Sequence, residues 1–320
     1  MPSAPPLVTL RDDIAAAAAR LAPYALRTPL VPARTLGDGV WLKCENLQRT
    51  GSFKIRGALN KILSLGDAAR ARGVVTSSTG NHGLAVAEAL RLVGGRGTVV
   101  VSASASPYKV ARLAKEGLEV VTHDGDPMAA ELSARALAEG DGRVYVSPYN
   151  DADVVAGQGT LGVELAEQLP EVDAVYVAVG GGGLAAGVAA AVKAARPSAR
   201  VVGCWPEHAQ AMLASIRAGR VVEVDEEPTL SDGTAGNLEP GSLTVPLCAA
   251  LIDEHVTVSE AEIARAMRDV ALGDKLVVEG AAGVAVAGWR ARAARAARTS
   301  VVILCGGNLG ADLLARTLAA

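Results

Sequence analysis

Residues 174–195 read AVYVAVGGGGLAAGVAAAVKAA, and the predicted fold depends on this stretch. The β-branched run Ala174–Val179 predicts a buried strand, and the alanine-rich run Ala185–Ala195 predicts a helix. The four glycines between them, Gly180 to Gly183, mark a turn. Because no Cβ stands in the way, their N–H groups can converge on one anion, and the helix N-terminus adds partial positive charge. We expect this turn to bind a monophosphate.

The alternation of strand and helix continues in both directions from this stretch. The predicted strands are apolar on both faces, as strands covered by helices on two sides are. Such alternation predicts an α/β fold with parallel sheets. A capping box, Ser259 with Glu262, is expected at the start of one helix. The other strands are predicted at 74–77, 97–101, 119–122, 143–146, 200–204 and 300–305, and the other helices at 55–65, 83–92, 109–116, 127–138, 160–168, 208–217, 260–272 and 311–319.

Composition limits the class of protein. Of 320 residues, 50% are hydrophobic but only 3% are aromatic, which predicts a core of small aliphatic side chains. The net charge of -3, without a basic stripe, argues against a nucleic-acid partner. No apolar run approaches the roughly 18 residues of a membrane span, and the N-terminus lacks the pattern of a signal peptide. We therefore expect a cytoplasmic protein without nucleic-acid or membrane partners.

The four cysteines are Cys44, Cys204, Cys248 and Cys305. They are widely spaced and form no Cys-x-x-Cys pair, which argues against a zinc ribbon and against a disulfide framework. Their apolar neighbours predict buried positions in strands.

The stretch Thr50–Ala58 reads TGSFKIRGA and contains an unusually placed lysine. Lys54 stands beside Phe53, the only phenylalanine in the chain, where a helix is predicted to begin. A desolvated ammonium loses its proton more readily than an exposed one. Because a neutral amine near a carbonyl forms a Schiff base, Lys54 is predicted to be a reactive amine.

Two further loops follow predicted strands. Residues Ser77–Gly83 read SSTGNHG, and their hydroxyl and N–H groups favour a carboxylate ligand, whereas a simple helix cap needs one such residue. Cys305–Asn308 follows the last strand, at the edge where open α/β sheets bind ligands. A Schiff-base lysine, a phosphate site and a carboxylate site together point to pyridoxal phosphate.

On these residues the chain resembles the serine/threonine dehydratase and serine racemase family of fold type II pyridoxal-phosphate enzymes. The resemblance implies a two-domain α/β fold with the cofactor in the cleft. The large domain would comprise residues 1–49 plus 147–320, and the small mobile domain residues 50–146. The family also implies a homodimer. The matching blocks, which follow one another in family order, are Lys43–Gln48, Thr50–Ala58, Ser78–Gly83, Ala156–Thr160, Gly180–Leu184, Glu279–Gly283 and Cys305–Asn308.

The resemblance also implies roles at the matching positions. Lys54 would hold the cofactor as a Schiff base and then move the Cα proton. The other residues implied to contact the cofactor are Phe53 against the ring, Asn81 at the 3-hydroxyl, Gly180, Gly181, Gly182, Gly183 and Leu184 around the phosphate, Glu279 near the ring and Cys305 at the pyridine nitrogen. The residues implied to line the site of the amino-acid substrate are Ser78, Thr79, Asn81, His82 and Tyr149.

Three comparisons with the racemases and dehydratases of the family help to choose between these two activities. Thr79 stands where racemases carry a serine that acts on the opposite face of Cα, and its methyl group crowds that face. Its hydroxyl keeps it a candidate catalytic residue, but racemisation is disfavoured. The positions aligned with a divalent-cation site of the racemases are Trp205, Ala209 and Ala211, so no metal site of that kind is predicted. An aromatic residue at Tyr149 favours the dehydratases.

Together these residues predict β-elimination of water from an L-3-hydroxy amino acid, with L-threonine or L-serine as substrate and a 2-oxo acid and ammonia as products. Lys54 would act as general base, and the cofactor phosphate is one source of the proton for the leaving hydroxyl. Dehydration of 3-hydroxyaspartate, of a phenylserine-like compound or of a hydroxyectoine-pathway compound stays open, and so does serine racemisation. The role of residues 223–244, the longest irregular stretch, is also left open.

Two functions of other classes are weighed against this one. A nicotinamide oxidoreductase would need a Gly-x-Gly-x-x-Gly turn followed by a ribose-binding acidic residue, which the chain lacks. A catalytically silent cofactor-binding protein is opposed by the presence of Lys54, Asn81 and the glycine turn.

Overall fold

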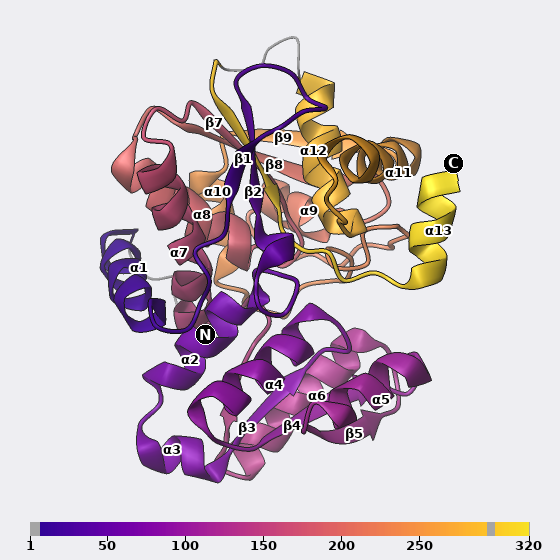
Figure 1. The fold of residues 1–320 in the computed structure, drawn as a ribbon. Coiled ribbons are helices and arrows are strands. Elements are labelled where there is room, and N and C mark those ends of the chain that lie inside the picture. The colour runs from indigo at the N-terminus through magenta and orange to yellow at the C-terminus, as the bar shows by residue number, and fades with distance from the viewer. Residues whose placement is uncertain (1–6, 293–297, 320) are drawn as a thin grey trace.

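The computed structural model describes residues 7–292 and 298–319, and its strands form two sheets (Figure 1). The larger sheet has the order β1-β2-β10-β7-β8-β9 and the smaller has the order β5-β4-β3-β6. Strand β1 runs antiparallel to β2, whereas the other pairs of neighbouring strands in the two sheets run parallel. The predicted α/β fold with parallel-rich sheets is therefore confirmed.

The elements have the following bounds. The strands of the larger sheet are β1 (Leu30–Pro32), β2 (Val40–Cys44), β7 (Ala174–Ala178), β8 (Arg200–Pro206), β9 (Glu254–Val258) and β10 (Ser300–Leu304), and those of the smaller sheet are β3 (Val74–Ser77), β4 (Gly97–Ser102), β5 (Glu119–His123) and β6 (Val144–Tyr145). The helices are α1 (Leu7–Leu21), α2 (Lys54–Ser64), α3 (Asp67–Arg72), α4 (Asn81–Val93), α5 (Pro107–Lys115), α6 (Pro127–Gly140), α7 (Ala152–Gln168), α8 (Gly183–Ala195), α9 (Ala211–Ala218), α10 (Thr244–Leu251), α11 (Glu260–Asp269), α12 (Gly280–Arg292) and α13 (Ala311–Ala319), with short turns η1 (Glu45–Leu47) and η2 (Val270–Asp274).

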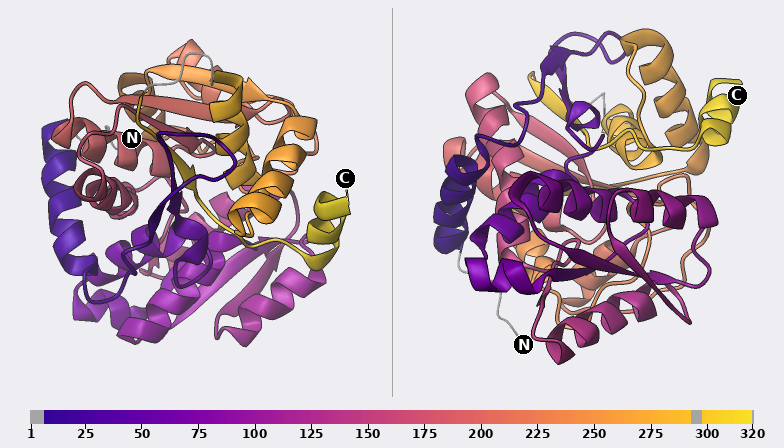
Figure 2. Two further views of the ribbon diagram at one scale, coloured as in Figure 1. Left: turned by 45° about the horizontal axis from the view of Figure 1, so that its top comes forward. Right: turned by 60° about the horizontal axis from the view of Figure 1, so that its bottom comes forward.

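The smaller sheet is covered by helices on both faces (Figure 2). Side chains alternate along a strand, so Val99 and Val101 of β4 pack into one apolar cluster with residues of α4, and Val100 packs into another with residues of α6. The edge strand β5 departs from the prediction that strands are apolar on both faces, because residues such as Glu119 are exposed.

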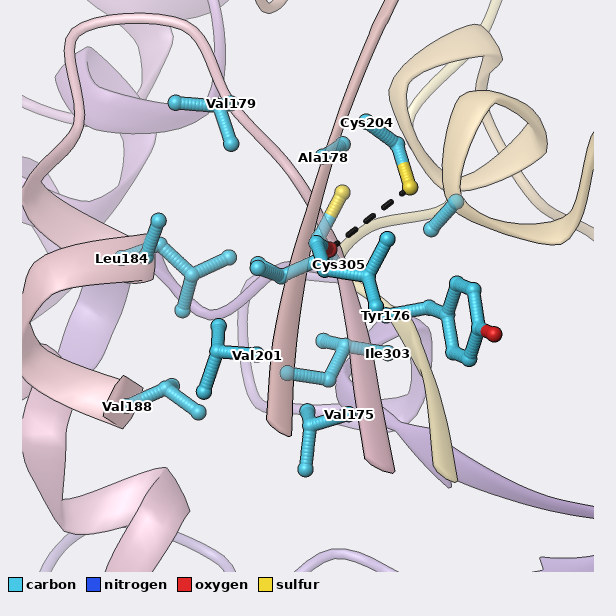
Figure 3. Close-up of a cluster of buried hydrophobic side chains, with 14 of the residues drawn as sticks. Val175, Tyr176, Ala178, Val179, Leu184, Val188, Val201, Cys204, Ile303 and Cys305 are labelled. Carbon is cyan, nitrogen blue, oxygen red and sulfur yellow. Dashed lines mark hydrogen bonds between the residues drawn. The ribbon is translucent and has the colours of Figure 1, made fainter. Parts of the chain in front are cut away.

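The core of the larger sheet lies around β7, β8 and β10 (Figure 3). Val175, Val201 and Ile303 are fully buried there, and Val188 of α8 packs in the same cluster. Helix α12 contacts strands β7, β8, β9 and β10. Small aliphatic side chains therefore make up most of this core, as the composition predicts, with Trp205 and Tyr176 among the few aromatic ones.

All seven predicted strands and nine predicted helices are present, and apart from the start of α7 their ends lie within three residues of the prediction. The prediction placed the start of α7 at residue 160 rather than at Ala152, and it missed strands β1, β2 and β9 and helices α1, α3, α10 and α12. Helices α7 and α12 contain glycines, which cost about 1 kcal/mol each in a helix and weaken the pattern. In α12 a Cβ at Gly288 would lie 2.4 Å from Cys204 Sγ, so close packing against β8 requires glycine there. The capping box of Ser259 and Glu262 is confirmed.

The four cysteines are free and buried. Cys44 and Cys204 lie in strands, and Cys305 directly follows β10. Cys248 lies in helix α10, so its predicted place in a strand is wrong. The run from Leu247 to Leu251 is short and apolar, a pattern that does not distinguish a buried helix from a buried strand.

The described residues contain no helix that is both long and apolar enough to cross a membrane. Residues 1–6, part of the N-terminal stretch considered for a signal peptide, lie outside the described ranges. The strands of the smaller sheet all fall between residues 74 and 145. The boundaries of the two domains and the mobility of the smaller one stay predictions.

A buried network of charged side chains fixes the start of α2. Arg56 donates from Nε and Nη2 to Glu45 at 2.8 Å each, and from Nη1 and Nη2 to Glu164 at 2.7 and 3.0 Å. Lys43 Nζ donates to Glu164 at 2.6 Å. Two cations and two carboxylates are thus paired, and the network joins β2, η1, α2 and α7.

We predict that Arg56→Ala destabilises the protein by about 3–5 kcal/mol, because it leaves the fully buried Glu45 carboxylate without its main partner. Urea unfolding followed by circular dichroism measures this loss. Arg91→Ala is the control, since Arg91 pairs with Glu88 on the surface of α4, and we expect its unfolding midpoint to stay close to that of the wild type. Equal midpoints for the two variants would contradict the importance of the network.

Candidate active site

Lys54 is the first residue of α2, and the turn before it is tied to the end of β10. Phe53 N donates to the carbonyl of Cys305 at 3.0 Å, and Ser52 forms a bridge with Gly306. Lys54 Nζ donates to the carbonyl of Pro148 at 2.8 Å and lies 5.3 Å from the centroid of the Phe53 ring. The amine is therefore held at the edge of the larger sheet where β10 ends.

The ammonium of Lys54 is short of charged partners. Burial lowers its pKa to about 8, although the carboxylates of Glu131 and Glu279 and the thiol of Cys305 act in the other direction. Slightly above neutral pH, the Lys54 amine is therefore unprotonated in a large fraction of molecules, as a nucleophile or a general base must be.

The glycine turn at the start of α8 leaves no room for side chains. A Cβ at Gly180 would lie 2.8 Å from Thr234 Cα, and one at Gly181 would lie 2.3 Å from Tyr149 Cγ. Gly182 has φ of 83°, the left-handed region that favours glycine. Glycine is thus required at positions 180 and 181 because there is no space for a side chain, and at position 182 because of the backbone conformation.

This turn fits a phosphate group. Thr244 Oγ1 donates to the carbonyl of Gly181 at 2.7 Å, and Cys248 Sγ donates to that of Gly182 at 3.6 Å. Within the described residues, no side chain caps the N-terminus of α8. The uncovered main-chain N–H groups and the helix dipole suit a ligand with negative charge. Leu184, also predicted to contact the cofactor, is buried in the first turn of α8.

Asn81 and Glu279 are brought together from opposite parts of the chain. Asn81 Nδ2 donates to the two oxygens of Glu279 at 2.9 and 3.1 Å, and Asn308 Nδ2 donates to Asn81 Oδ1 at 2.8 Å. Burial raises the pKa of Glu279 to about 7, although the hydrogen bond from Asn81 opposes this rise. The predicted contact of Asn81 with the 3-hydroxyl of a cofactor stays a prediction, as does the place of Glu279 near the ring.

His82 is neutral at physiological pH. Burial and the nearby charge of Lys54 lower its pKa to about 3. Its Nε2 lies 3.0 Å from the carbonyl of Val146 and donates to it as the neutral tautomer, while its buried Nδ1 has no partner among the described residues. Ser78 Oγ accepts from Gly80 N at 3.1 Å, and Thr79 is half-buried in the same loop. The loop thus presents polar groups at the uncapped N-terminus of α4, close to Lys54.

Tyr149 and Cys305 complete the set of predicted residues. Tyr149 is buried beside the glycine turn, and its hydroxyl accepts from Glu239 N at 2.7 Å. The thiol of Cys305 is buried, and burial and then Glu279 raise its pKa well above the usual value. A neutral thiol next to the site is consistent with a partner for an unprotonated ring nitrogen, which stays a prediction.

Two acidic residues of this region were not predicted from the sequence, namely Glu131 on α6, which affects the pKa of Lys54, and Glu239 in the loop before α10, which affects that of Glu131. Glu131 is one of two acidic residues in an alanine-rich helix, and a glutamate in such a helix gives no signal of burial. Glu239 belongs to the long stretch 223–244, whose role the sequence leaves open. In the described part of the chain, no group of three or more His, Cys, Asp or Glu side chains could hold a metal ion.

Comparison with known proteins adds independent evidence. Residues 21–306 match the family model described as pyridoxal-phosphate dependent enzyme. The L-threonine ammonia-lyase of Thermotoga maritima is 40% identical over 98% of this chain and 78% of its own length. Threonine deaminase isoform 2 from Solanum lycopersicum has a TM-score of 0.90 and 31% identity, with 100% of this chain and 95% of that chain covered. Maize serine racemase has a TM-score of 0.88 and 33% identity, with 97% and 96% covered.

We predict that Gly181→Ala weakens the binding of pyridoxal phosphate to the apoprotein roughly tenfold or more, since overpacking costs about 1–3 kcal/mol. The added Cβ would meet the Tyr149 ring, which its hydrogen bond to Glu239 holds in place. An absorbance titration of the apoprotein measures the affinity. Gly140→Ala is the control, because a Cβ there meets nothing within 4 Å. Unchanged affinity in Gly181→Ala would show that the glycine turn does not hold the phosphate.

Proposed function

The chain belongs to the pyridoxal-phosphate dependent enzymes, and from this premise we propose that it removes water from L-threonine and L-serine by β-elimination. The products are 2-oxobutanoate or pyruvate together with ammonia. The observation that carries the proposal is the buried, poorly compensated amine of Lys54 near a glycine turn that fits a phosphate. Bound there, pyridoxal phosphate supplies the electron sink that makes the Cα proton acidic.

Lys54 is the group that attaches the cofactor and then acts as the base in this proposal. Its amine is neutral in a substantial fraction of molecules because burial lowers its pKa to about 8. A base with a pKa near the working pH combines a high population of the free form with useful strength. The contact of Nζ with the carbonyl of Pro148 holds the amine in one position.

The loop before α4 binds the substrate carboxylate in this proposal. The N-terminus of α4 has Gly80 at its cap position and no side-chain cap, so its N–H groups are available to an anion. Ser78 and neutral His82 add polar groups without negative charge, which suits a carboxylate.

Thr79 favours elimination over racemisation. Racemisation needs a second group that returns a proton to the opposite face of Cα, whereas elimination needs only one base. The threonine hydroxyl is available for this step, but the restricted χ1 of a β-branched side chain limits its approach. Serine racemase is therefore kept as the second candidate activity, on the strength of the likeness to the maize enzyme.

The proposal also includes a cytoplasmic homodimer, which rests on the family resemblance. Sedimentation of the purified holoprotein at two concentrations tests the oligomeric state, and a monomer at both would remove this part of the proposal.

We predict that the reconstituted protein releases a 2-oxo acid and ammonia in equal amounts from L-threonine and L-serine, and that Lys54→Ala slows this reaction by at least about 100-fold. A coupled 2-oxo acid assay, an ammonia assay and chiral chromatography of residual serine make the measurement. Lys115→Ala, which changes an exposed lysine of α5, is the control and keeps the wild-type rate.

Two results would contradict the proposal. A protein that forms no 2-oxo acid from either substrate, or a Lys54→Ala variant as active as the control, would exclude this dehydratase activity. D-serine formed faster than pyruvate would favour the racemase instead.

A further inference from the structure

One carboxyl group near Lys54 has no role in the function proposed above. Glu131 lies on α6, and of the charged groups around Lys54 it affects the pKa of that amine most. Its Oε1 atom is buried, and among the described residues no group donates a hydrogen bond to it. A buried carboxyl with an unused oxygen is costly unless something binds to it. The group is thus available to a ligand that enters beside Lys54.

The neighbouring Glu239 accepts the hydrogen bonds that Arg135 and Asn150 donate. Arg135 Nη2 donates to its two oxygens at 2.9 and 2.8 Å, and Asn150 Nδ2 donates to Oε2 at 2.7 Å. Glu239 is therefore stabilised as a carboxylate. Glu131 lies within hydrogen-bonding reach of this carboxylate, whose negative charge favours the protonated form of Glu131.

The surroundings of Glu131 favour its protonated form. Burial and then the negative charge of Glu239 raise the pKa of Glu131 to about 8, against the opposing charges of Lys54 and Arg135. The other titratable groups that face it are the phenols of Tyr145 and Tyr149, which burial keeps neutral. Glu131 is consequently a neutral carboxylic acid at physiological pH, and its protonated form can donate.

Glu131 and the groups around it border Lys54 on a side that neither the carboxylate nor the phosphate is proposed to occupy. In the function proposed above, the substrate carboxylate binds the loop before α4 and the cofactor phosphate binds the glycine turn. Lys54 Nζ donates to the carbonyl of Pro148, and the hydroxyl of the neighbouring Tyr149 accepts from Glu239 N, which joins this segment to Glu239 and Glu131. This side is the one left for the side chain of a substrate.

We propose that Glu131 donates the proton that converts the leaving β-hydroxyl of the substrate into water, a role that rests on the dehydratase function proposed above. Lys54 takes the Cα proton, and the electron pair of that bond becomes the Cα–Cβ double bond. The C–O bond breaks with its pair on oxygen, and the proton of Glu131 completes the water molecule. Transfer of the extra proton from Lys54 to Glu131 restores both groups, so the step needs no further reactant.

The same arrangement selects the side chain of the substrate. A second carboxylate on the substrate, as in 3-hydroxyaspartate, would lie beside Glu131 and ionised Glu239. Arg135 compensates this charge only in part, because its Nε and Nη2 already donate to Glu239. The acid pair thus favours neutral side chains such as those of serine and threonine.

Glu131→Gln tests the proposal, because glutamine keeps the shape of the side chain but cannot give up a proton in this way. We expect kcat for L-serine to fall by about 100-fold or more, the usual contribution of a general acid. With β-chloro-L-alanine, whose chloride leaves without a proton, kcat should stay within about threefold of the wild type. Glu139→Gln, an exposed glutamate on the same helix, is the control and should match the wild type with both substrates.

The rates of the wild type and of Glu131→Gln with the two substrates decide between the alternatives. An unchanged rate with L-serine would overturn the proposal and favour the cofactor phosphate as the proton source. An equal loss with both substrates would also overturn it, because it would show a merely structural effect. If the wild type eliminates from neither substrate, the dehydratase function fails, which is distinct from failure of the Glu131 assignment.

A second readout does not depend on turnover. Difference infrared spectra of the apoprotein at pH 7 report protonated carboxyl groups, and we expect Glu131→Gln to remove one such signal while Glu139→Gln removes none. Equal spectra for the wild type and Glu131→Gln would show an ionised Glu131 and would overturn the proposal.

Discussion

The paired guanidinium of Arg56 is the constraint on which the rest of the site depends. It is almost fully buried, yet it donates to both oxygens of Glu45 and both oxygens of Glu164. This pairing fixes the first turn of α2 against β2 and α7. Lys54 lies two residues earlier and is half-buried, and the protein around it desolvates its amine without a directly paired carboxylate. In the same turn, the charge of Arg56 is fully paired with carboxylates, whereas Lys54 tends to lose its proton. This difference explains how a reactive amine can form there.

The site forms between the two sheets, and several polar contacts join helices around the smaller sheet to the rest of the chain. Asn81 of α4 donates to Glu279, Arg135 of α6 donates to Glu239, and Lys109 of α5 pairs with Asp232 at 3.2 Å. Two of these contacts lie next to groups with a raised pKa, Glu279 and Glu131. Contacts between the two parts of the molecule and the protonation of the site are therefore coupled through the same side chains.

The sequence predicts much of this arrangement because local patterns carry it. The Ala174–Ala195 stretch, with its strand, glycine turn and helix, identifies the fold class, and the context of Lys54 and the Ser77–Gly83 loop identifies the chemistry. The features that the sequence does not predict depend on contacts between residues that lie far apart in the chain. Glu131 and Glu239 lie more than 100 residues apart, and only the folded chain brings them together. The glycines of α12 likewise look unfavourable until the sulfur of Cys204 is seen against one of them.

The central claim is that burial lowers the pKa of Lys54 to about 8, and the titration of this amine tests the claim most directly. The apoprotein can be exposed briefly to pyridoxal phosphate with borohydride at a series of pH values, and the modified lysines then counted by peptide mass spectrometry. The account predicts that modification of Lys54 rises through a midpoint near pH 8. Lys61 is the internal reference, because Asp151 and Asp153 raise its pKa despite its burial, so its modification should begin at higher pH. A Lys54 midpoint at or above that of Lys61 would contradict the account.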